Sequence, residues 1–133
     1  MRPDLTSLSI CRWTVAFVWI YQGLVPKLLG PHADELAMAS VLGLGPVVTP
    51  WVSRGAGVAE ILFGLVLFAA YRQRWPWLLT LLSMIGFQLF ATVATPGLLV
   101  GAFNATTLDL TCAALAWIAL VELGRPDAGA APQ

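Results

Sequence analysis

The stretch WVSRGAGVAEILFGLVLFAA, Trp51 to Ala70, decides the fold because it is long and apolar enough to cross a lipid bilayer. A helix rises about 1.5 Å per residue, so about 20 residues span a hydrocarbon core of roughly 30 Å. Three further apolar segments lie at residues 8–25, 77–95 and 107–121. None of the four alternates as a barrel strand would, so the sequence predicts an all-α bundle of four transmembrane helices.

The composition agrees with a membrane environment. Hydrophobic residues make up 59% of the 133 residues and charged residues only 11%, whereas soluble domains carry about 25% charged residues. We therefore expect a lipid bilayer to cover much of the surface. Seven Lys and Arg balance seven Asp and Glu without a basic block, which argues against nucleic-acid binding.

The connections predict further features of this single domain, which we place at residues 1–124. Pro26 is expected to end the first span. Residues 32–42 begin with acids and are followed by a glycine, which predicts a short extra helix in the outer loop between the first two spans. The polar tail, residues 125–133, is expected to be disordered.

The distribution of basic residues predicts the orientation, because Lys and Arg concentrate in cytoplasmic loops. In a topology with four spans, the larger group of Lys and Arg residues falls on the same side of the membrane as both termini. We therefore expect cytoplasmic termini in the bacterial cytoplasmic (inner) membrane. The larger group is Arg2, Arg12, Arg72, Arg74 and Arg125; the opposite side has Lys27 and Arg54.

The cysteines and the histidine indicate neither a disulfide nor a metal site. Cys11 and Cys112 are expected at depths on the order of 20 Å apart, beyond the about 7 Å limit between the Cα atoms of a disulfide. His32 is the one histidine, and imidazole ligands usually bind metals in groups. No catalytic motif is present, so we assign no catalytic and no metal-binding residues.

Glu60 is the most informative polar residue, because an ionisable group inside a span costs about 2.5–3.5 kcal/mol and usually faces other helices. It belongs to a stripe of small residues with Ser53, Gly57 and Gly64, at spacings of four, three and four. This stripe predicts close approach of another helix. Two roles stay open: a structural ion pair with Arg54 or Lys27, and ligand binding in a site shared with Gln22.

Other polar residues are expected in the same outer half of the bundle. Gln22 and Gln88 either join this site or only hydrogen-bond between helices. The sequence Thr106-Thr107-Leu108-Asp109 matches a capping box, so Asp109 is expected chiefly to cap the last helix, with ligand binding as the alternative.

The segment WIYQGLVPKL, Trp19 to Leu28, resembles the first-helix signature of DoxX-like membrane proteins. Pro31 to Glu35, Gly57-x-x-Glu60 and Phe103-Asn104 resemble the same family. The wider group is similar to the small subunit of thiosulfate:quinone oxidoreductase. The resemblance implies a four-helix bundle associated with quinone-linked redox metabolism. Ala105 departs from the family pattern, where proline commonly follows Phe-Asn, and Asp109 replaces the more usual asparagine.

Three functions remain open. The first is a redox-associated subunit, not an enzyme on its own, that binds a quinone or similar amphiphile beside an oxidoreductase subunit or a second copy of itself. The second is a scaffold whose polar cluster only fixes helix register. The third is a small-solute or proton pathway through Glu60, although no inverted repeat of the usual transporter kind is visible. The candidate ligand-binding residues are Glu60, Gln22, Lys27, Trp19, Tyr21, Arg54, Gln88, Asn104 and Asp109, with Phe87 as a further apolar wall.

Overall fold

The computed structural model describes residues 3–30, 32–101 and 104–125. Arg2, Pro31, Phe103 and residues 126–133, including most of the predicted disordered tail, lie outside the described residues. The elements, in chain order, are α1 (Pro3–Gly23), the π-helical turn η1 (Leu24–Leu28), α2 (Ala33–Ser40), α3 (Gly45–Ala69), α4 (Trp75–Ala94), the 3-10 helix η2 (Pro96–Val100) and α5 (Ala105–Gly124).

Four helical segments are long and apolar enough to cross a membrane: Ser7–Leu28, Gly45–Ala69, Trp75–Ala94 and Ala105–Gly124. They confirm the predicted four-span, all-α architecture, and α2 confirms the short extra helix after the first span. The largest difference in bounds is at α3, which begins before the predicted residue 51. Pro46 suits its first turn. Positive φ angles occur at Gly43 (69°), in the preceding turn, and at Gly45 (78°), the first residue of α3.

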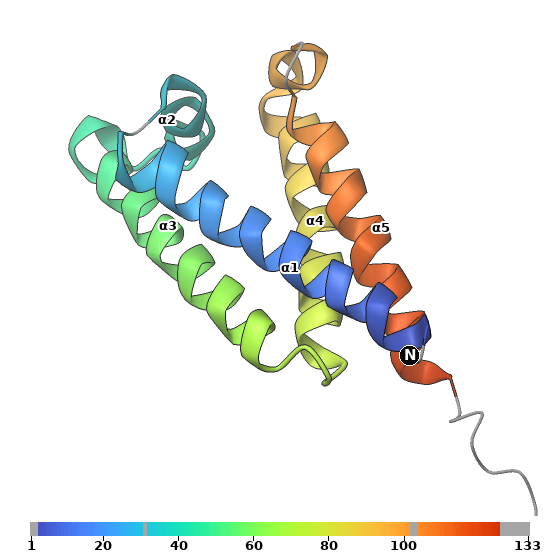
Figure 1. Ribbon diagram of the computed structural model, residues 1–133. Helices are drawn as coiled ribbons and strands as arrows, with labels where there is room; N and C mark the ends of the chain where they lie inside the picture. Colours follow the sequence, from blue (N-terminus) through green and yellow to red (C-terminus); the bar gives the residue numbers. More distant parts are fainter. Residues whose placement is uncertain (1–2, 31, 102–103, 126–133) are drawn as a thin grey trace, which may run out of the picture.

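The helices form two pairs (Figure 1). Helix α1 packs against α3 on one side and α5 on another, while α4 packs against α5. Although α3 and α4 follow one another in the chain, they make few contacts. The pairs converge near the N-terminus and the 70–74 turn and diverge toward the end that carries α2 and η2. We call the latter the α2 end of the bundle.

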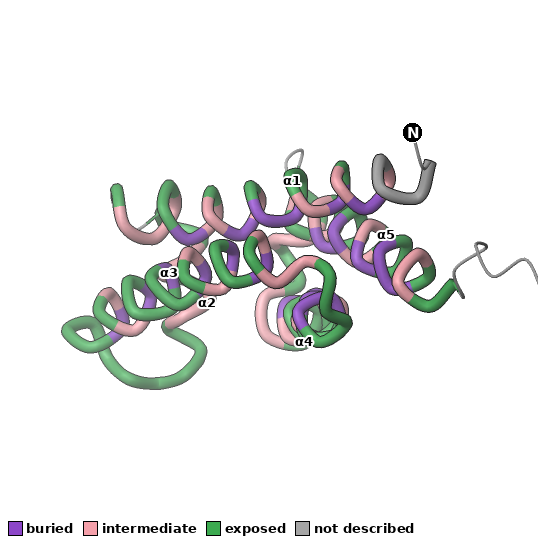
Figure 2. Tube along the Cα trace, turned by 60° about the horizontal axis from the view of Figure 1, so that its bottom comes forward, coloured by how far each residue is buried: buried purple, intermediate pink, exposed green. Residues whose placement is uncertain are grey.

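Buried residues gather on the sides of the helices that face one another (Figure 2). Val15, Leu67, Trp77 and Ala116 form the centre of the apolar core. The indole Nε1 of Trp77 donates to the carbonyl oxygen of Tyr71 at 2.7 Å, which satisfies its polar edge. Large apolar side chains cover the outward faces, as expected where lipid surrounds the helices.

The predicted small-residue stripe of α3 packs against α1. Ser53, Gly57, Glu60 and Gly64 are all buried. A Cβ atom on Gly64 would lie 2.8 Å from Cγ1 of Ile20, and one on Gly57 would lie 2.8 Å from Cβ of Lys27. The glycines therefore let the two backbones approach closely, and this packing brings Glu60 beside the end of α1.

The prediction that Pro26 ends the first span was wrong. The helix continues through η1, where the backbone N–H of Leu29 donates to the carbonyl oxygen of Leu24 at 2.9 Å. Pro26 has no N–H with which to extend the α-helical pattern, and the chain widens into a π turn, a local feature frequent at functional sites. Lys27 lies inside this turn, packed over Gly57.

Candidate ligand-binding site

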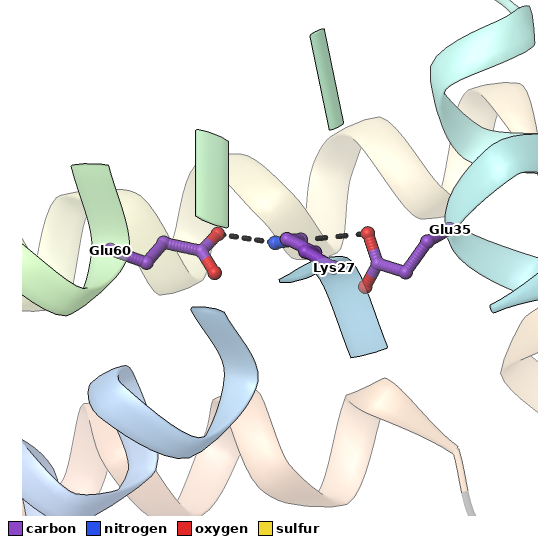
Figure 3. Close-up of polar contacts among 3 residues, drawn as sticks. All are labelled: Lys27, Glu35 and Glu60. Atoms are coloured by element: carbon purple, nitrogen blue, oxygen red, sulfur yellow. Dashed lines mark hydrogen bonds and ion pairs between the residues drawn. The ribbon is translucent and has the colours of Figure 1, made fainter. Parts of the chain in front are cut away.

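Lys27 lies between two carboxylates (Figure 3). Its ammonium group donates a hydrogen bond to Oε1 of Glu60 and forms an ion pair with Oε2 of Glu35, with 3.7 Å between the charged atoms. The Lys27 side chain is only 13% exposed. Three segments thus meet at one cation: η1 supplies Lys27, α3 supplies Glu60 and α2 supplies Glu35. The ion pair expected for Glu60 is present, and Lys27 rather than Arg54 provides it.

These charges border a cavity of about 150 Å³ in which residues of all five α-helices and η1 take part. Its wall is apolar over most of its lining and polar at one group of side chains. The apolar lining residues are Val18, Trp19, Met38, Met84, Phe87, Ala91, Ala105 and Leu108. The polar ones are Gln22, Lys27, Glu35, Glu60 and Asp109.

Asp109 does not cap α5, so that prediction was wrong. The N-cap is Asn104, whose side-chain oxygen accepts from the backbone N–H of Thr107 at 3.1 Å. The helix therefore begins before Thr106, and Asp109 falls in its second turn, where the backbone amides already have helical partners. It is 9% exposed and lines the cavity. Within the described residues, no side chain forms a hydrogen bond or ion pair with it.

Glu60 keeps one oxygen free. Lys27 occupies Oε1, whereas Oε2 is buried and has no hydrogen-bond partner among the described residues. Gln22 lines the same cavity, but no hydrogen bond joins Gln22 to Glu60 among the residues that the structure describes. An unsatisfied buried acceptor costs about 1–3 kcal/mol, so a hydrogen-bond donor entering the cavity would stabilise the site.

Glu35 is held in an unfavourable environment for a charge. Burial raises the pKa of its carboxyl group above the ordinary value, and this effect exceeds the lowering by the Lys27 ammonium. The charge of Glu60 raises the pKa of Glu35 further. The ion pair between Lys27 and Glu35 is therefore the weaker of the two contacts of Lys27, and it depends on whether the Glu35 carboxyl group is protonated.

Trp19 and Phe87 form part of the apolar wall. The indole Nε1 of Trp19 donates to Oγ1 of Thr80 at 3.3 Å, so its polar edge is satisfied within the bundle. Its ring packs edge-on against Phe63 at 4.8 Å and lies 6.3 Å from the ring of Phe87. The wall thus presents aromatic carbon to a ligand.

Four predicted site residues lie outside the cavity lining. Tyr21 is 48% exposed and packs on Phe17, because it precedes Gln22 on the helix and so points about 100° away. Arg54 is exposed, with its guanidinium 5.3 Å from the ring centre of Trp51. Gln88 donates to Oγ1 of Thr106 at 3.3 Å, as expected for a bond between helices. Asn104 caps α5.

Sequence reasoning missed Glu35, Met38 and Met84. The acids at the start of α2 were interpreted only as charges favourable at a helix N-terminus. In the structure α2 packs against α3, and Glu35 and Met38, three residues apart, share the face that lines the cavity. Their spacing with respect to one another was visible in the sequence, but the direction in which α2 folds was not.

The described part of the chain contains no group of three His, Cys, Asp or Glu residues arranged to hold a metal ion. Cys11 and Cys112 are both buried and free. A paired lysine and three carboxyl groups border the apolar cavity.

The fold and the pocket define a helical, multi-pass membrane protein with a charged cavity at one end of its bundle. The chain belongs to the DoxX-like family, whose model matches residues 16–117. This match confirms the resemblance found in the sequence, and it contains all five polar residues of the cavity. No curated protein and no solved structure matches the chain.

Proposed function

We propose that the protein binds a quinone or a similar amphiphile in this cavity and serves as a redox-associated membrane subunit. The observation that carries the proposal is the combination, in one cavity, of an aromatic and aliphatic wall with a buried charged cluster. Small-molecule sites generally have this composition, a mostly apolar lining with few polar groups that orient the ligand.

The size of the cavity supports a single-ring head group. Its volume is about 150 Å³, comparable to that of an engineered apolar cavity that binds benzene. A six-membered ring fits this space, with Trp19 and Phe87 beside it. The outward faces of α3 and α4 carry exposed apolar side chains such as Leu62 and Leu82, so an alkyl tail on the ring would remain in lipid.

The side chains of the cavity can bind and orient such a ligand, but none of them carries electrons. In this proposal a partner exchanges the electrons with the ligand. The partner is either an oxidoreductase subunit or a redox group bound together with a second copy of the chain. We place the protein in the bacterial cytoplasmic membrane, with the α2 end outward and both termini in the cytoplasm.

The scaffold function remains the competing proposal, because the Lys27–Glu60 pair also joins η1, the continuation of α1, to α3 where the two segments pack closely. Glu60→Leu separates the two. This variant removes one member of a buried ion pair, which costs about 3–5 kcal/mol, although Lys27 keeps Glu35 as a second partner; binding is therefore compared only in variant protein that is shown to be folded. Glu60→Gln keeps the size and hydrogen bonding of the side chain but removes its charge.

The test is to purify the protein from its membrane, extract bound small molecules and identify them by mass spectrometry. We expect a quinone, in its oxidised or reduced form, in wild type and in Asp34→Asn, a control acid that is exposed on α2, and loss of it in folded Glu60→Leu. Absence of any ring-containing amphiphile from wild type, or equal amounts in folded Glu60→Leu, would favour the scaffold.

A further inference from the structure

The polar wall of the cavity presents more hydrogen-bond acceptors than donors. Three carboxyl groups, those of Glu35, Glu60 and Asp109, face one ammonium group, that of Lys27. The Trp19 N–H is bound to Thr80, so it is not available to a ligand. Gln22 adds one amide, which can act in both ways. The wall therefore suits a head group that donates hydrogen bonds.

Lys27 is a poor donor for a ligand carbonyl. Its ammonium group is bound to Glu60 and directed toward Glu35 on the other side (Figure 3). A carbonyl oxygen that approaches this ammonium group also approaches two carboxylates, whose negative charge opposes the partial negative charge of the carbonyl. The cation thus neutralises the protein's own acids.

The unpartnered acceptors come from different helices. Oε2 of Glu60 on α3 is buried without a partner. Asp109 on α5 is 9% exposed as a residue, and its carboxyl group has no hydrogen-bond or ion-pair partner in the described part of the chain. Glu60 on α3 and Asp109 on α5 line the same ring-sized cavity from separate helices, and α1 contacts both of these helices.

We infer that the cavity selects the reduced form of its ligand, a hydroquinone, whose hydroxyl groups donate to Asp109 and to Oε2 of Glu60. The inference rests on the proposed function and adds the oxidation state that the site recognises. A quinone has two carbonyl oxygens and no donor, so it leaves both carboxyl groups unsatisfied. Hydrogen bonds to charged groups contribute about 1.5–3 kcal/mol each, equivalent to about tenfold or more in affinity.

The experiment measures three ligands on the purified full-length protein in detergent, by titration calorimetry under nitrogen. The probes are decylhydroquinone, decylbenzoquinone and the dimethyl ether of decylhydroquinone, which has the same ring and tail but no donor. We expect the hydroquinone to bind at least about tenfold more tightly than the other two.

Substitutions test which carboxyl groups of the cavity accept the hydrogen bonds of the hydroquinone. Asp109→Asn offers an amide N–H in place of one carboxylate oxygen, so it should reduce the preference for hydroquinone by about tenfold or more and improve quinone binding. Glu60→Gln should act in the same direction. Asp34→Asn makes the same acid-to-amide change outside the cavity and should keep the wild-type preference.

The outcomes separate this inference from the proposed function. Equal affinities for hydroquinone and quinone, or tighter quinone binding, overturn the inference and leave the proposed binding intact. Binding of none of the three probes overturns both. A preference that survives in both Asp109→Asn and Glu60→Gln overturns the assignment of the acceptors, whereas its loss in either folded variant supports it.

Discussion

Gly57 and Gly23 approach so closely that a Cβ atom on Gly57 would lie 2.6 Å from the carbonyl oxygen of Gly23. This contact joins α3 to the end of α1 at the level where Lys27 leaves the helix and reaches Glu60. The position of the charged cluster thus depends on the absence of a side chain at residue 57, because any larger residue moves the two helices apart.

Gly57→Ala should destabilise the protein by about 1–3 kcal/mol, as overpacking of a tight interface does. The matched control is Gly55→Ala, two residues away on the same helix, where a Cβ atom meets nothing within 4 Å. That change should be neutral or slightly stabilising, because alanine favours helix by up to about 1 kcal/mol over glycine. Unfolding in mixed detergent micelles measures both. Equal effects would contradict the close packing of α1 on α3.

Lys27→Met should destabilise the fold by about 3–5 kcal/mol, because it leaves two acids without their cation. The double variant Lys27→Met/Glu60→Leu should recover much of the loss, since it removes the more buried charge as well. Arg54→Met is the control: it removes an exposed cation that lies against Trp51 and should change stability and ligand affinity little. A loss with Arg54→Met as large as with Lys27→Met would show that net charge, rather than the ion pair, matters.

Glu35 should make the stability of the protein fall as pH rises. Its pKa is raised in the folded state, so above pH 4.5, the ordinary pKa of the group, the folded protein binds the proton more tightly than the unfolded chain. The stability that results is present at low pH and is lost as pH rises through the raised pKa. Lys27, Glu60 and His32 act on the same carboxyl group, so the comparison must be between wild type and Glu35→Gln.

The difference in melting temperature, wild type minus Glu35→Gln, should therefore decrease between pH 4.5 and neutral pH. Asp34→Asn, an exposed change on the same helix, should not produce this slope. If the difference instead increases with pH, attraction by Lys27 outweighs burial, and the pKa of Glu35 is lowered rather than raised.

The orientation can be tested by cysteine labelling in intact cells, in a background without Cys11 and Cys112. Gln73→Cys in the turn between α3 and α4 should react only after the membrane is permeabilised, whereas Ala33→Cys at the start of α2 should react from outside. Both positions are exposed, so access depends on the side of the membrane. The reverse pattern would place the α2 end in the cytoplasm.

The fold could be predicted from the sequence because each span is governed by a local property, a long apolar run. The burial of Glu60 was also predictable, since its stripe with Gly57 and Gly64 follows helical periodicity. The sequence limited the ion-pair partner of Glu60 to two candidates, Lys27 and Arg54, without choosing between them. The choice depends on the π turn, which directs Lys27 inward, and no residue pattern other than Pro26 signals that turn.

The remaining errors have a shared physical cause, competition between local and tertiary solutions. The capping box ending at Asp109 satisfies a local pattern, but Asn104 caps the helix first and leaves Asp109 to face the cavity. Glu35 likewise suits a helix start, yet α2 folds against α3 and brings it to Lys27. Sequence identifies polar residues that require an explanation, whereas the packing of α2 and α5 decides which of them meet.

The pairing of Lys27 with Glu60 also bears on how the chain enters the membrane. Each residue lies on a different span, and a charged side chain that enters the bilayer without its partner is costly. Together they form a neutral unit. We therefore expect α1 and α3 to leave the insertion machinery as a joined hairpin, with α1 retained there until α3 has been synthesised.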